Sequence, residues 1–590
     1  MTHSIQTDFA PEELSNGVGK LKDALTQTTP TTALSGLSLS DIHKGATSTQ
    51  PSPPKSPDTD EAKKSNRKGA EDAKTVGQGE FESEQHFYPR VLNAQIHPLV
   101  QSFFTLGNER IIARYTHLNP QVDAEKLKEI LSYTPKYFQW AGEGRDLMKK
   151  PAHSYSQPDP VLPPAIQVTN ILLVLSLLGS DLFNVTTSSG QRQMIVIETN
   201  SCPSGQKSMP LLSEIDEHNE LGGYRTVLES AFREQLSKAD KSLGDLAVIC
   251  DKNMMEASGY AAVLAEVAKE KVWLAEWHDG EEDVPVKWVD RVLQVRDANK
   301  EWHPIRACFR YVTQKPWNRF PLNTKTIVMN QIISCLAGGR NKMMAARAYD
   351  FYNAELVDTG LSVRVPETIN NVTRGEIPLW IHSMGGHAVL KVPYSNAGQG
   401  VYTITNPNEL KDFLEQDHHY DKFIVQSLVG NASWSSVTRS GKFYHVGTIP
   451  NKKSNTFVSD LRMMVTGNAD GFRPICIYGR KARLPLTTKL APDANTWDML
   501  GTNLSVKLPD GGWTTDTGRL ILMDRKDFNQ LGLGIDDLID AYIQTVLAVI
   551  AIDRMAARLM ASGTFDYNLF SSLNPDNALM QEIKMANEDW

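Results

Sequence analysis

Residues 387–400 read HAVLKVPYSNAGQG, an apolar segment typical of a strand that ends in a lysine and is followed by a loop of small residues. The lysine, Lys391, places a cation on a rigid strand, from which it can reach phosphate oxygens. Because residues 395–400 of the loop have no aromatic or branched side chain and include two glycines, their backbone N–H groups can close over a polyphosphate. The lysine precedes the glycines, unlike in a Walker A loop or a Rossmann fingerprint, and an ordinary β-hairpin with a surface lysine is the alternative. The predicted nucleotide contacts are Lys391, Ser395, Asn396, Gly398, Gln399 and Gly400.

A second candidate strand, DKFIVQSLVG at residues 421–430, follows further along the chain. A strand with a polar and then apolar exit suits an adenine slot, in which backbone groups read the base edge and apolar side chains enclose the ring. Any edge strand has a similar pattern, so the interpretation of this segment as an adenine slot depends mainly on its distance from Lys391 in the sequence. The residues predicted to contact the base are Gln426, Ser427 and Leu428.

A metal-binding pattern stands much earlier, in the segment IETNSCPSGQK at residues 197–207. Residues two apart on a strand point to the same face, so Glu198 and Asn200 are expected to project together. A carboxylate and an amide oxygen suit Mg²⁺, a hard cation that shares phosphate oxygens. Asp181 lies one strand earlier and offers a second acid. The alternative is a strand end with an asparagine-capped turn.

The order of elements around these segments predicts an α/β fold with α+β regions. Strands are predicted at 246–250, 272–275 and 307–311, with an alanine-rich helix at 258–271. This strand–helix–strand order is typical of a parallel sheet. Four parts are predicted along the chain: a disordered tail (1–82), a mostly helical region that also holds the metal-site strand (83–243), a strand–helix–strand subdomain (244–384), and nucleotide-binding subdomains with a lid loop (385–590).

Composition limits the function further. The chain has 590 residues and a formal net charge of −8, which gives no electrostatic footprint for nucleic acid. Residues 1–82 are rich in Ser, Thr, Pro and Lys and nearly lack aromatic side chains, so burial cannot offset the entropy of ordering them. Five cysteines without a CxxC pair argue against a disulfide framework or a zinc site. Because no apolar run reaches the roughly 18–20 residues that span a bilayer, a soluble cytoplasmic protein is expected.

Together these segments resemble the ATP-grasp superfamily, and in particular its circularly permuted members such as eukaryotic glutathione synthetase and the glutathionylspermidine-synthetase-like proteins. In unpermuted members the Glu-x-Asn magnesium strand follows the lysine strand, whereas here Glu198-Thr-Asn200 precedes Lys391. The continuation NSCPSG, residues 200–205, is also similar to the permuted families. The resemblance covers residues 87–590 and implies a circularly permuted ATP-grasp fold with a parallel-sheet substrate-binding subdomain.

Three further residues take roles from this resemblance. The segment ACFRY, residues 307–311, is similar to the strand whose arginine binds substrate, which implies that role for Arg310. The segment LAGGRNK, residues 336–342, is similar to the one that carries the first ATP-phosphate lysine, here Lys342, and Lys391 matches the second. The segment SDLR, residues 459–462, resembles an Asp-x-Arg strand whose arginine, Arg462, faces the transferring phosphate.

The metal site and the substrate stay open. Glutathione synthetases carry a glutamate four residues after the second lysine, whereas this chain has Ser395, so the third magnesium ligand is undetermined. Their glycine-rich loop is also altered here, which leaves the glutathione substrate itself undecided. Near the C-terminus, GTFDYN at residues 563–568 resembles the place where unpermuted relatives have their first magnesium aspartate. Asp566 therefore competes with Asp181, and a non-permuted arrangement with Asp566 and Asn568 is the second interpretation.

The resemblance implies a ligase that uses ATP and Mg²⁺ to join a carboxylate to an amine through an acyl phosphate. The expected partners are small-molecule carboxylate and amine substrates, with an amino acid or short peptide favoured, and neither nucleic acid nor membrane. A homodimer is left open. An ATP-grasp phosphotransferase and a catalytically inactive ATP-binding protein are the alternatives.

Overall fold

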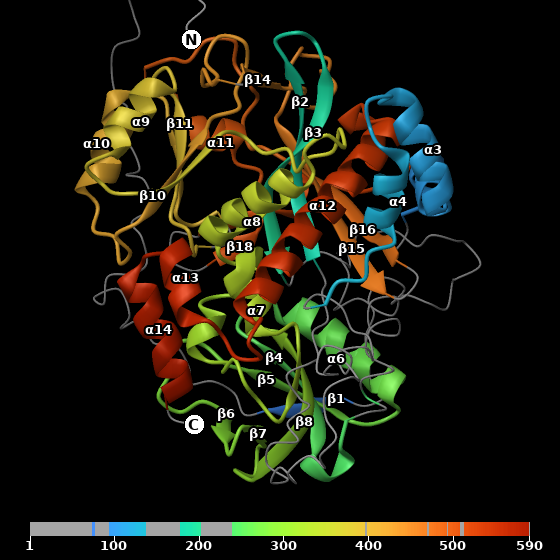
Figure 1. Ribbon diagram of the computed structural model, residues 1–590, viewed down its shortest axis with the longest axis vertical. Helices are drawn as coiled ribbons and strands as arrows, with labels where there is room; N and C mark the ends of the chain where they lie inside the picture. The colour runs from blue at the N-terminus through green and yellow to red at the C-terminus, as the bar shows by residue number, and fades with distance from the viewer. Residues whose placement is uncertain are drawn as a thin grey trace, which may run out of the picture. The chain divides into compact units, whose positions relative to one another are not determined.

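The computed structural model describes residues 73–76, 94–136, 178–201, 236, 239–395, 398–439, 441–468, 471–492, 494–507 and 513–588 (Figure 1). All of these residues belong to one compact unit, Lys55–Trp590. Asn396 and most of the predicted tail, 1–82, lie outside the described residues. Within that tail Lys74–Val76 forms a short strand, β1, contrary to the predicted disorder, because its backbone pairs with the strand Val272–Glu276.

A seven-stranded mixed sheet contains the predicted strand–helix–strand unit (Figure 1). Its strands are β1, β4 (Asp245–Cys250), β5 (Val272–Glu276), β6 (Val286–Val289), β7 (Val292–Arg296), β8 (Trp302–Tyr311) and β9 (Ile327–Met329), in the order β1-β5-β4-β8-β7-β6 with β9 beside β8. The four central strands are parallel, since β4 pairs with β5 and β8, and β8 pairs with β9. Every residue of β4 after Asp245 is buried, as expected for a parallel strand covered on both faces. Helix α6 (Met254–Ala268) connects β4 to β5 and packs on both.

A six-stranded antiparallel sheet carries the predicted metal-site strand. Its strands are β2 (Leu178–Thr187), β3 (Arg192–Ser201), β14 (Phe443–His445), β15 (Ser459–Asn468), β16 (Gly471–Lys481) and β19 (Leu520–Ile521). β2 pairs with β3, β14 and β15. The long helix α12 (Ile535–Leu559) packs against β2, β3 and β15 (Figure 1). Asp537 accepts a hydrogen bond of 2.8 Å from the Gly534 N–H, which satisfies a free donor at the start of this helix.

A four-stranded antiparallel sheet carries Lys391. Its strands are β10 (Thr368–Val372), β11 (Ala388–Lys391), β12 (Val401–Ile404) and β13 (Phe423–Ser427), in the order β10-β13-β11-β12. Helices α9 (Ile377–Ser383) and α10 (Pro407–Glu415) supply Ile377, Ile381 and Phe413 to an apolar cluster with the sheet residues Leu390 and Val425. Because β11 is paired on both sides, the lysine at its end starts from a rigid backbone.

The remaining elements pack around these sheets. Helices α2, α3, α4 and α8 all contact α12, which makes that helix the centre of the main core. A two-stranded ribbon, β17 with β18, stands apart from the three larger sheets. The bounds are α2 Pro98–Phe104, α3 Asn108–Leu118, α4 Ala124–Leu131, α7 Ile332–Ser334, α8 Lys342–Glu355, α11 Thr496–Leu500, β17 Ser505–Lys507, β18 Trp513–Thr515, α13 Tyr567–Leu573 and α14 Asn577–Glu588, with short 3₁₀ or π turns at Lys241–Leu243, Pro316–Asn318, Cys335–Gly339, Thr517–Arg519 and Phe528–Leu531.

The predicted mixture of α/β and α+β structure is confirmed, with parallel strands in one sheet and antiparallel strands in the others. The three predicted strands at 246–250, 272–275 and 307–311 lie within β4, β5 and β8. The region predicted to be mostly helical, 83–243, contains a second strand besides the metal-site strand, because Leu178–Thr187 is the strand β2. A continuous apolar run has no periodicity that separates a buried strand from a buried helix.

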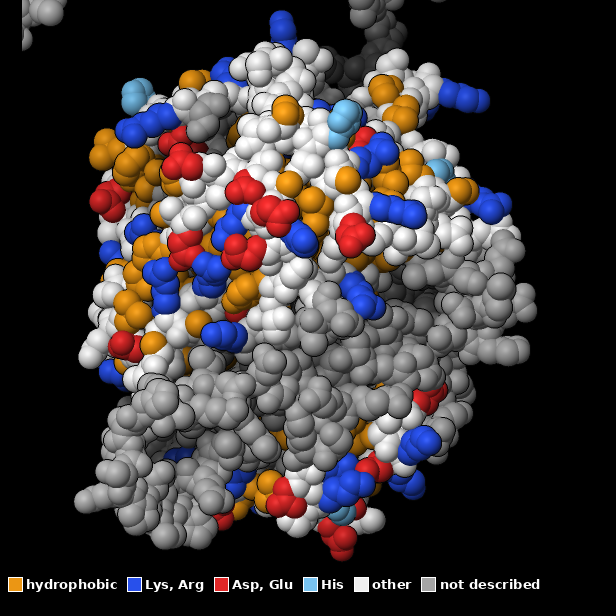
Figure 2. Space-filling model, turned by 45° about the vertical axis from the view of Figure 1, so that its right-hand side comes forward, with side chains coloured by type: hydrophobic (Ala, Val, Ile, Leu, Met, Phe, Trp, Pro, Cys, Tyr) orange, Lys and Arg blue, Asp and Glu red, His pale blue; other side chains and the backbone are white. Residues whose placement is uncertain are grey.

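Charged side chains of both signs are interspersed on the face shown in Figure 2, with apolar side chains between them. Ion pairs such as Arg114–Asp536 and Arg558–Glu355 hold some of these charges together. In the described part of the chain, the helices lack the combination of length and apolar character needed to cross a membrane.

Candidate nucleotide-binding site

A cavity of about 580 Å³ is lined by strands of both antiparallel sheets. Sites for small molecules and cofactors typically enclose roughly 300–1,000 Å³, so the cavity is large enough for a nucleotide. Side chains from β2, β3, β11, β12, β13, β15, β16 and α11 line it. Lys252, Asn253 and Tyr311, which lie at the carboxyl ends of β4 and β8, line it as well.

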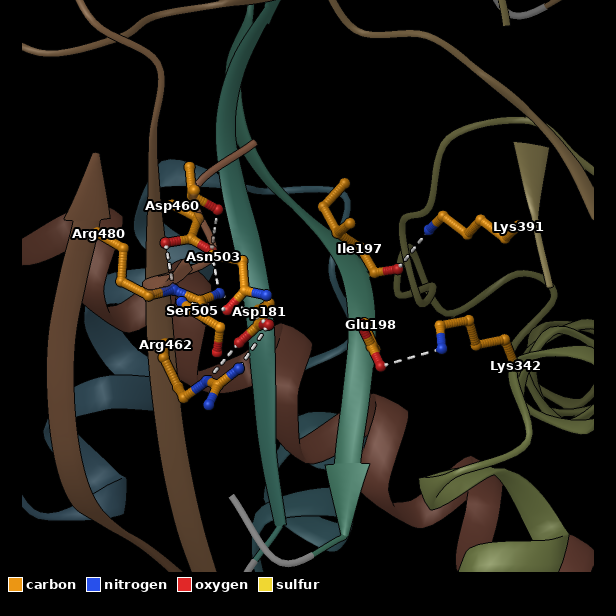
Figure 3. Close-up of polar contacts among 11 residues, drawn as sticks. Asp181, Ile197, Glu198, Lys342, Lys391, Asp460, Arg462, Arg480, Asn503 and Ser505 are labelled. Carbon is orange, nitrogen blue, oxygen red and sulfur yellow. Dashed lines mark hydrogen bonds and ion pairs between the residues drawn. The ribbon is translucent and has the colours of Figure 1, made fainter. Parts of the chain in front are cut away.

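Lys391 is buried at the end of β11, and its side chain lines this cavity. Its Nζ donates a hydrogen bond of 3.3 Å to the backbone oxygen of Ile197 on β3 (Figure 3). Burial lowers the pKa of the ammonium to about 8, and Lys342 adds to this effect while Glu198 opposes it. A buried cation whose charged form is disfavoured in the empty protein is suited to bind an anionic ligand group.

The lowered pKa makes Lys391 a destabilising group at neutral pH. With an ordinary pKa of 10.5, this lysine binds more protons in the unfolded chain than in the folded chain between pH 8 and 10.5, so its contribution to stability rises with pH in that window. Replacing Lys391 with methionine should therefore raise the free energy of unfolding at pH 7 by about 3 kcal/mol. The gain should shrink toward zero as the pH approaches 10.5. Urea unfolding of both proteins across this range measures the difference, and a pH-independent difference would contradict the assignment.

Lys342 reaches the same region from another part of the chain. It is the first residue of α8, where the Asn341 side chain caps the helix by accepting from the Met344 N–H at 3.2 Å. Its Nζ lies 3.4 Å from Glu198 Oε1 and donates to the backbone oxygen of Ser395 (Figure 3). Lys342 therefore links the metal-site strand to the loop that follows Lys391.

Glu198 and Asn200 both line the cavity, on the same face of β3 as predicted. The intervening Thr199 points the other way and shares a hydrogen bond of 2.7 Å with the Tyr349 hydroxyl. Asn200 is buried, and its Nδ2 has no hydrogen-bond partner among the described residues. Turning the amide exchanges nitrogen for oxygen, which lets Asn200 present an oxygen to a cation. This donor set, one carboxylate and one amide oxygen, fits Mg²⁺.

Asp181 is engaged by two arginines rather than free to bind a metal. Arg462 donates to both of its oxygens, at 2.5 and 2.7 Å, and Arg480 donates to Oδ2 at 2.8 Å (Figure 3). Burial alone would raise the pKa of this carboxyl, but the two guanidinium groups outweigh it and hold the pKa well below its usual range. Arg480 also bonds to Asp460, which accepts 2.8 Å from the Thr502 hydroxyl. Asp181 therefore positions Arg462 and Arg480 in the cavity wall.

Replacing Asp181 with asparagine should lower the free energy of unfolding by about 3 kcal/mol, because Arg462 would remain buried without its carboxylate. The loss of stability is at the lower end of the range usual for a broken buried ion pair, because Arg480 keeps Asp460 as a partner. Urea unfolding at pH 7 measures the effect. The exposed Asp412→Asn serves as the matched control, and an equal stability of the two variants would refute the structural role of Asp181.

The glycine loop after Lys391 is tied back to its strand. The Val392 N–H donates 2.7 Å to the Gly400 oxygen, and Gln399 lies in the turn between the two glycines. Gly398 and Gly400 have φ angles of +76° and +68°, which side chains rarely adopt. A Cβ at Gly398 would also come within 2.7 Å of Asn503 Nδ2. Gly398 lines the cavity, so the absence of a side chain there lets the backbone approach it.

The strand end predicted to hold the base also lines the cavity, through Gln426, Ser427 and Leu428. The Leu428 N–H donates 2.7 Å to the Ser436 hydroxyl, and the Ser427 N–H donates 2.8 Å to the Glu367 oxygen. These two donors are thus occupied within the protein, so any backbone contact of this segment with a base would use carbonyl oxygens, and the contact itself stays a prediction. The apolar walls that the prediction required are present.

Six of the described residues that were predicted for the site do not line the cavity: Lys342, Ser395, Gln399, Gly400, Arg310 and Asp566. The last two are engaged elsewhere in the fold. Arg310 is fully buried inside the parallel sheet, where its guanidinium donates 2.5 Å to the Asn330 oxygen and also bonds to the Val312 oxygen and to Cys335 Sγ. Its implied role in binding a substrate carboxylate is corrected, because the side chain serves backbone acceptors instead. Asp566 is an exposed cap of α13 that accepts 2.9 Å from the Leu569 N–H, and it does not line the cavity.

The polar residues of the cavity wall that were not predicted from the sequence include Arg340, His445 and Arg480. Arg480 lies opposite Asp460 in the register of β15 and β16, which only the fold reveals. Arg340 stands two residues before Lys342 in the segment predicted to bind phosphate, so its position was a usable signal. His445 is a single histidine in a three-residue strand and gave no signal.

The fold and the site define a mixed α/β protein whose cavity presents two lysines, arginines and a carboxylate–amide pair. No protein-family model and no curated protein matches the chain. Among solved structures, the chain is similar to a RimK-domain ATP-grasp protein from Sphaerobacter thermophilus (12% identity, 40% of this chain and 90% of that one, TM-score 0.24). It is also similar to a glutathione synthetase-like effector from Globodera pallida (11%, 66% and 86%, 0.31) and to D-alanyl-alanine synthetase A from Vibrio cholerae (12%, 44% and 93%, 0.24).

Proposed function

We propose that the chain is an ATP-dependent ligase with a permuted ATP-grasp site, which joins a carboxylate to an amine and releases ADP and phosphate. The observation that carries the proposal is that Lys391 and Glu198 line one cavity and that Lys342, from a third element, lies 3.4 Å from Glu198. A cluster of cations beside a carboxylate–amide pair matches what a metal-bound polyphosphate needs. The cavity also has room for a second reactant beside the nucleotide.

Glu198 and Asn200 would hold Mg²⁺. When bound there, Mg²⁺ neutralises charge on the β- and γ-phosphate oxygens, which reduces their repulsion of an attacking carboxylate. Lys391 and Lys342 would add positive charge at the phosphates, and both approach β3 from the side on which Lys342 contacts Glu198 (Figure 3). Glu198 partly compensates the charge of both lysines, so arriving phosphates would replace an existing partner rather than meet bare cations.

Arg462 would face the phosphoryl group during transfer. Its two hydrogen bonds to Asp181 fix the plane of the guanidinium group. Because this cation is already oriented, it needs no reorganisation when negative charge develops on the phosphoryl group in the transition state. The glycine loop would cover the phosphates and exclude water, because an acyl phosphate is lost when it is hydrolysed. Lys342 already contacts this loop at Ser395, so phosphate binding and loop position would be coupled.

The test is a screen of ADP and phosphate release with Mg²⁺–ATP against pairs of amino acids, short peptides and polyamines. A ligase should require both partners and form an amide of their combined mass less water, as seen by mass spectrometry. A phosphorylated product without an amide would instead identify a phosphotransferase. Absence of a Mg²⁺- and ATP-dependent thermal shift would refute nucleotide binding itself.

A further inference from the structure

His445 is a buried residue at one end of the cavity. It is the last residue of β14 and is 9% exposed, and its backbone N–H donates 2.9 Å to the Gly430 oxygen. Its ring packs edge-on against Phe183 of β2, with ring centroids 4.4 Å apart. Both rings line the cavity together with Val429. The imidazole therefore has a defined position in the cavity wall.

The polar atoms of this ring are unsatisfied. Neither Nδ1 nor Nε2 of His445 forms a hydrogen bond of good geometry with a described residue, and its weak backbone contact with Val429 offsets only part of the effect of burial. Burial lowers the pKa of the imidazole to about 3, so the ring is neutral at neutral pH and offers one donor and one acceptor. Buried polar groups without partners are rare in folded proteins because each costs stability. A ligand that enters the cavity would supply the missing partner.

The surroundings indicate which part of a ligand reaches His445. Phe183, Val389, Leu428 and Val429 make this end of the cavity apolar, whereas the lysines and arginines line the rest. A nucleotide would place its phosphates among the cations and its base between the apolar side chains. Since the Leu428 N–H is occupied by Ser436, it is not available to the base edge, whereas the imidazole of His445 lines the same end of the cavity.

We propose that the imidazole of His445 hydrogen-bonds to the edge of the adenine ring and acts as a base-recognition residue. The adenine edge carries an amino donor next to ring-nitrogen acceptors, and a neutral imidazole has a matching acceptor and donor. The inference rests on the proposed function, because it requires a nucleotide in this cavity. It goes beyond that proposal by assigning base recognition to a side chain of β14 rather than to the backbone of β13.

The experiment measures the dissociation constants of ATP and of inorganic tripolyphosphate by calorimetry with Mg²⁺ present. His445→Leu removes both polar atoms at similar size, and His445→Asn retains a donor and an acceptor. We expect His445→Leu to weaken ATP binding about 10- to 30-fold and to leave tripolyphosphate binding unchanged. His445→Asn should recover part of the ATP affinity. The apo form of His445→Leu should unfold at the same or a higher temperature, since two unsatisfied atoms are removed.

The outcomes separate this inference from the proposed function. If wild type binds ATP and His445→Leu binds it equally well, water satisfies the ring and the inference is overturned while the ligase proposal stands. Equal weakening of ATP and tripolyphosphate would also overturn it, because the histidine would then shape the cavity as a whole. If wild type binds neither, both proposals fall. Should His445→Leu not fold, the comparison of wild type with His445→Asn decides, and equal weakening of both ligands again overturns the inference.

Discussion

Replacing Lys391 with methionine is expected to slow ATP turnover by about 100- to 1,000-fold, or 3–4 kcal/mol of transition-state stabilisation. Methionine keeps a similar length and suits a buried site, so the loss reports the charge rather than the packing. Lys391 starts from a strand paired on both sides, and its ammonium is held 3.3 Å from the Ile197 oxygen, so little reorganisation is needed to meet a phosphate. The rate of ADP release with the substrate pair from the screen is the measurement.

A stability measurement and a control variant separate the loss of the charge from a loss of folding. The same variant should be more stable than wild type at pH 7, because a buried cation of lowered pKa has been removed, so a lower rate cannot be attributed to unfolding. The exposed Lys411→Met on α10 is the matched control and should leave the rate unchanged. Wild-type turnover by the Lys391 variant would show that the phosphates bind elsewhere.

Replacing Glu198 with glutamine should reduce Mg²⁺-dependent turnover by a similar factor of about 100- to 1,000-fold. The amide keeps the shape of the side chain but removes the charge that would hold the cation. It also leaves Lys342 without its partner at 3.4 Å, so the cavity becomes more positive. ATP titrated in EDTA should therefore bind the variant at least as tightly as wild type, while the added affinity that Mg²⁺ gives should be lost.

This opposite response of metal-free and metal-bound nucleotide identifies Glu198 as a metal ligand rather than a structural residue. A general loss of ATP affinity, equal with and without Mg²⁺, would contradict the assignment. The exposed Glu415→Gln, which removes the same charge from the surface of α10, should change neither quantity.

Much of the site was accessible from local pattern alone. Alternation along a strand correctly predicted that Glu198 and Asn200 share a face, and the strand at residues 388–391 delivers Lys391 into a cavity. Those inferences need only backbone periodicity, which the sequence carries directly. The order of the motifs along the chain can also be read from the sequence, and the circular permutation that this order suggests stays a prediction.

Local sequence pattern does not predict the surroundings of three residues, Arg310, Asp181 and Asp566. The arginine lies on a predicted strand next to a cavity residue, Tyr311, yet its own side chain turns to backbone acceptors inside the sheet. Asp181 does line the cavity, but two arginines from strands far along the chain neutralise it. Asp566 caps a helix in solvent. The role of each depends on partners remote in sequence, which periodicity cannot supply.

The sequence by itself determined the strand that carries Lys391, the carboxylate–amide face of β3, the parallel unit around β4 and the order in which these segments occur. Only the tertiary structure decided that Lys342 pairs with Glu198, that Asp181 is a partner for arginines, and that His445 lines the apolar end of the cavity. The physical reason is the distance along the chain over which each property is determined. Strand alternation is set by neighbouring residues, whereas the charge state and availability of a buried side chain are set by groups hundreds of residues away.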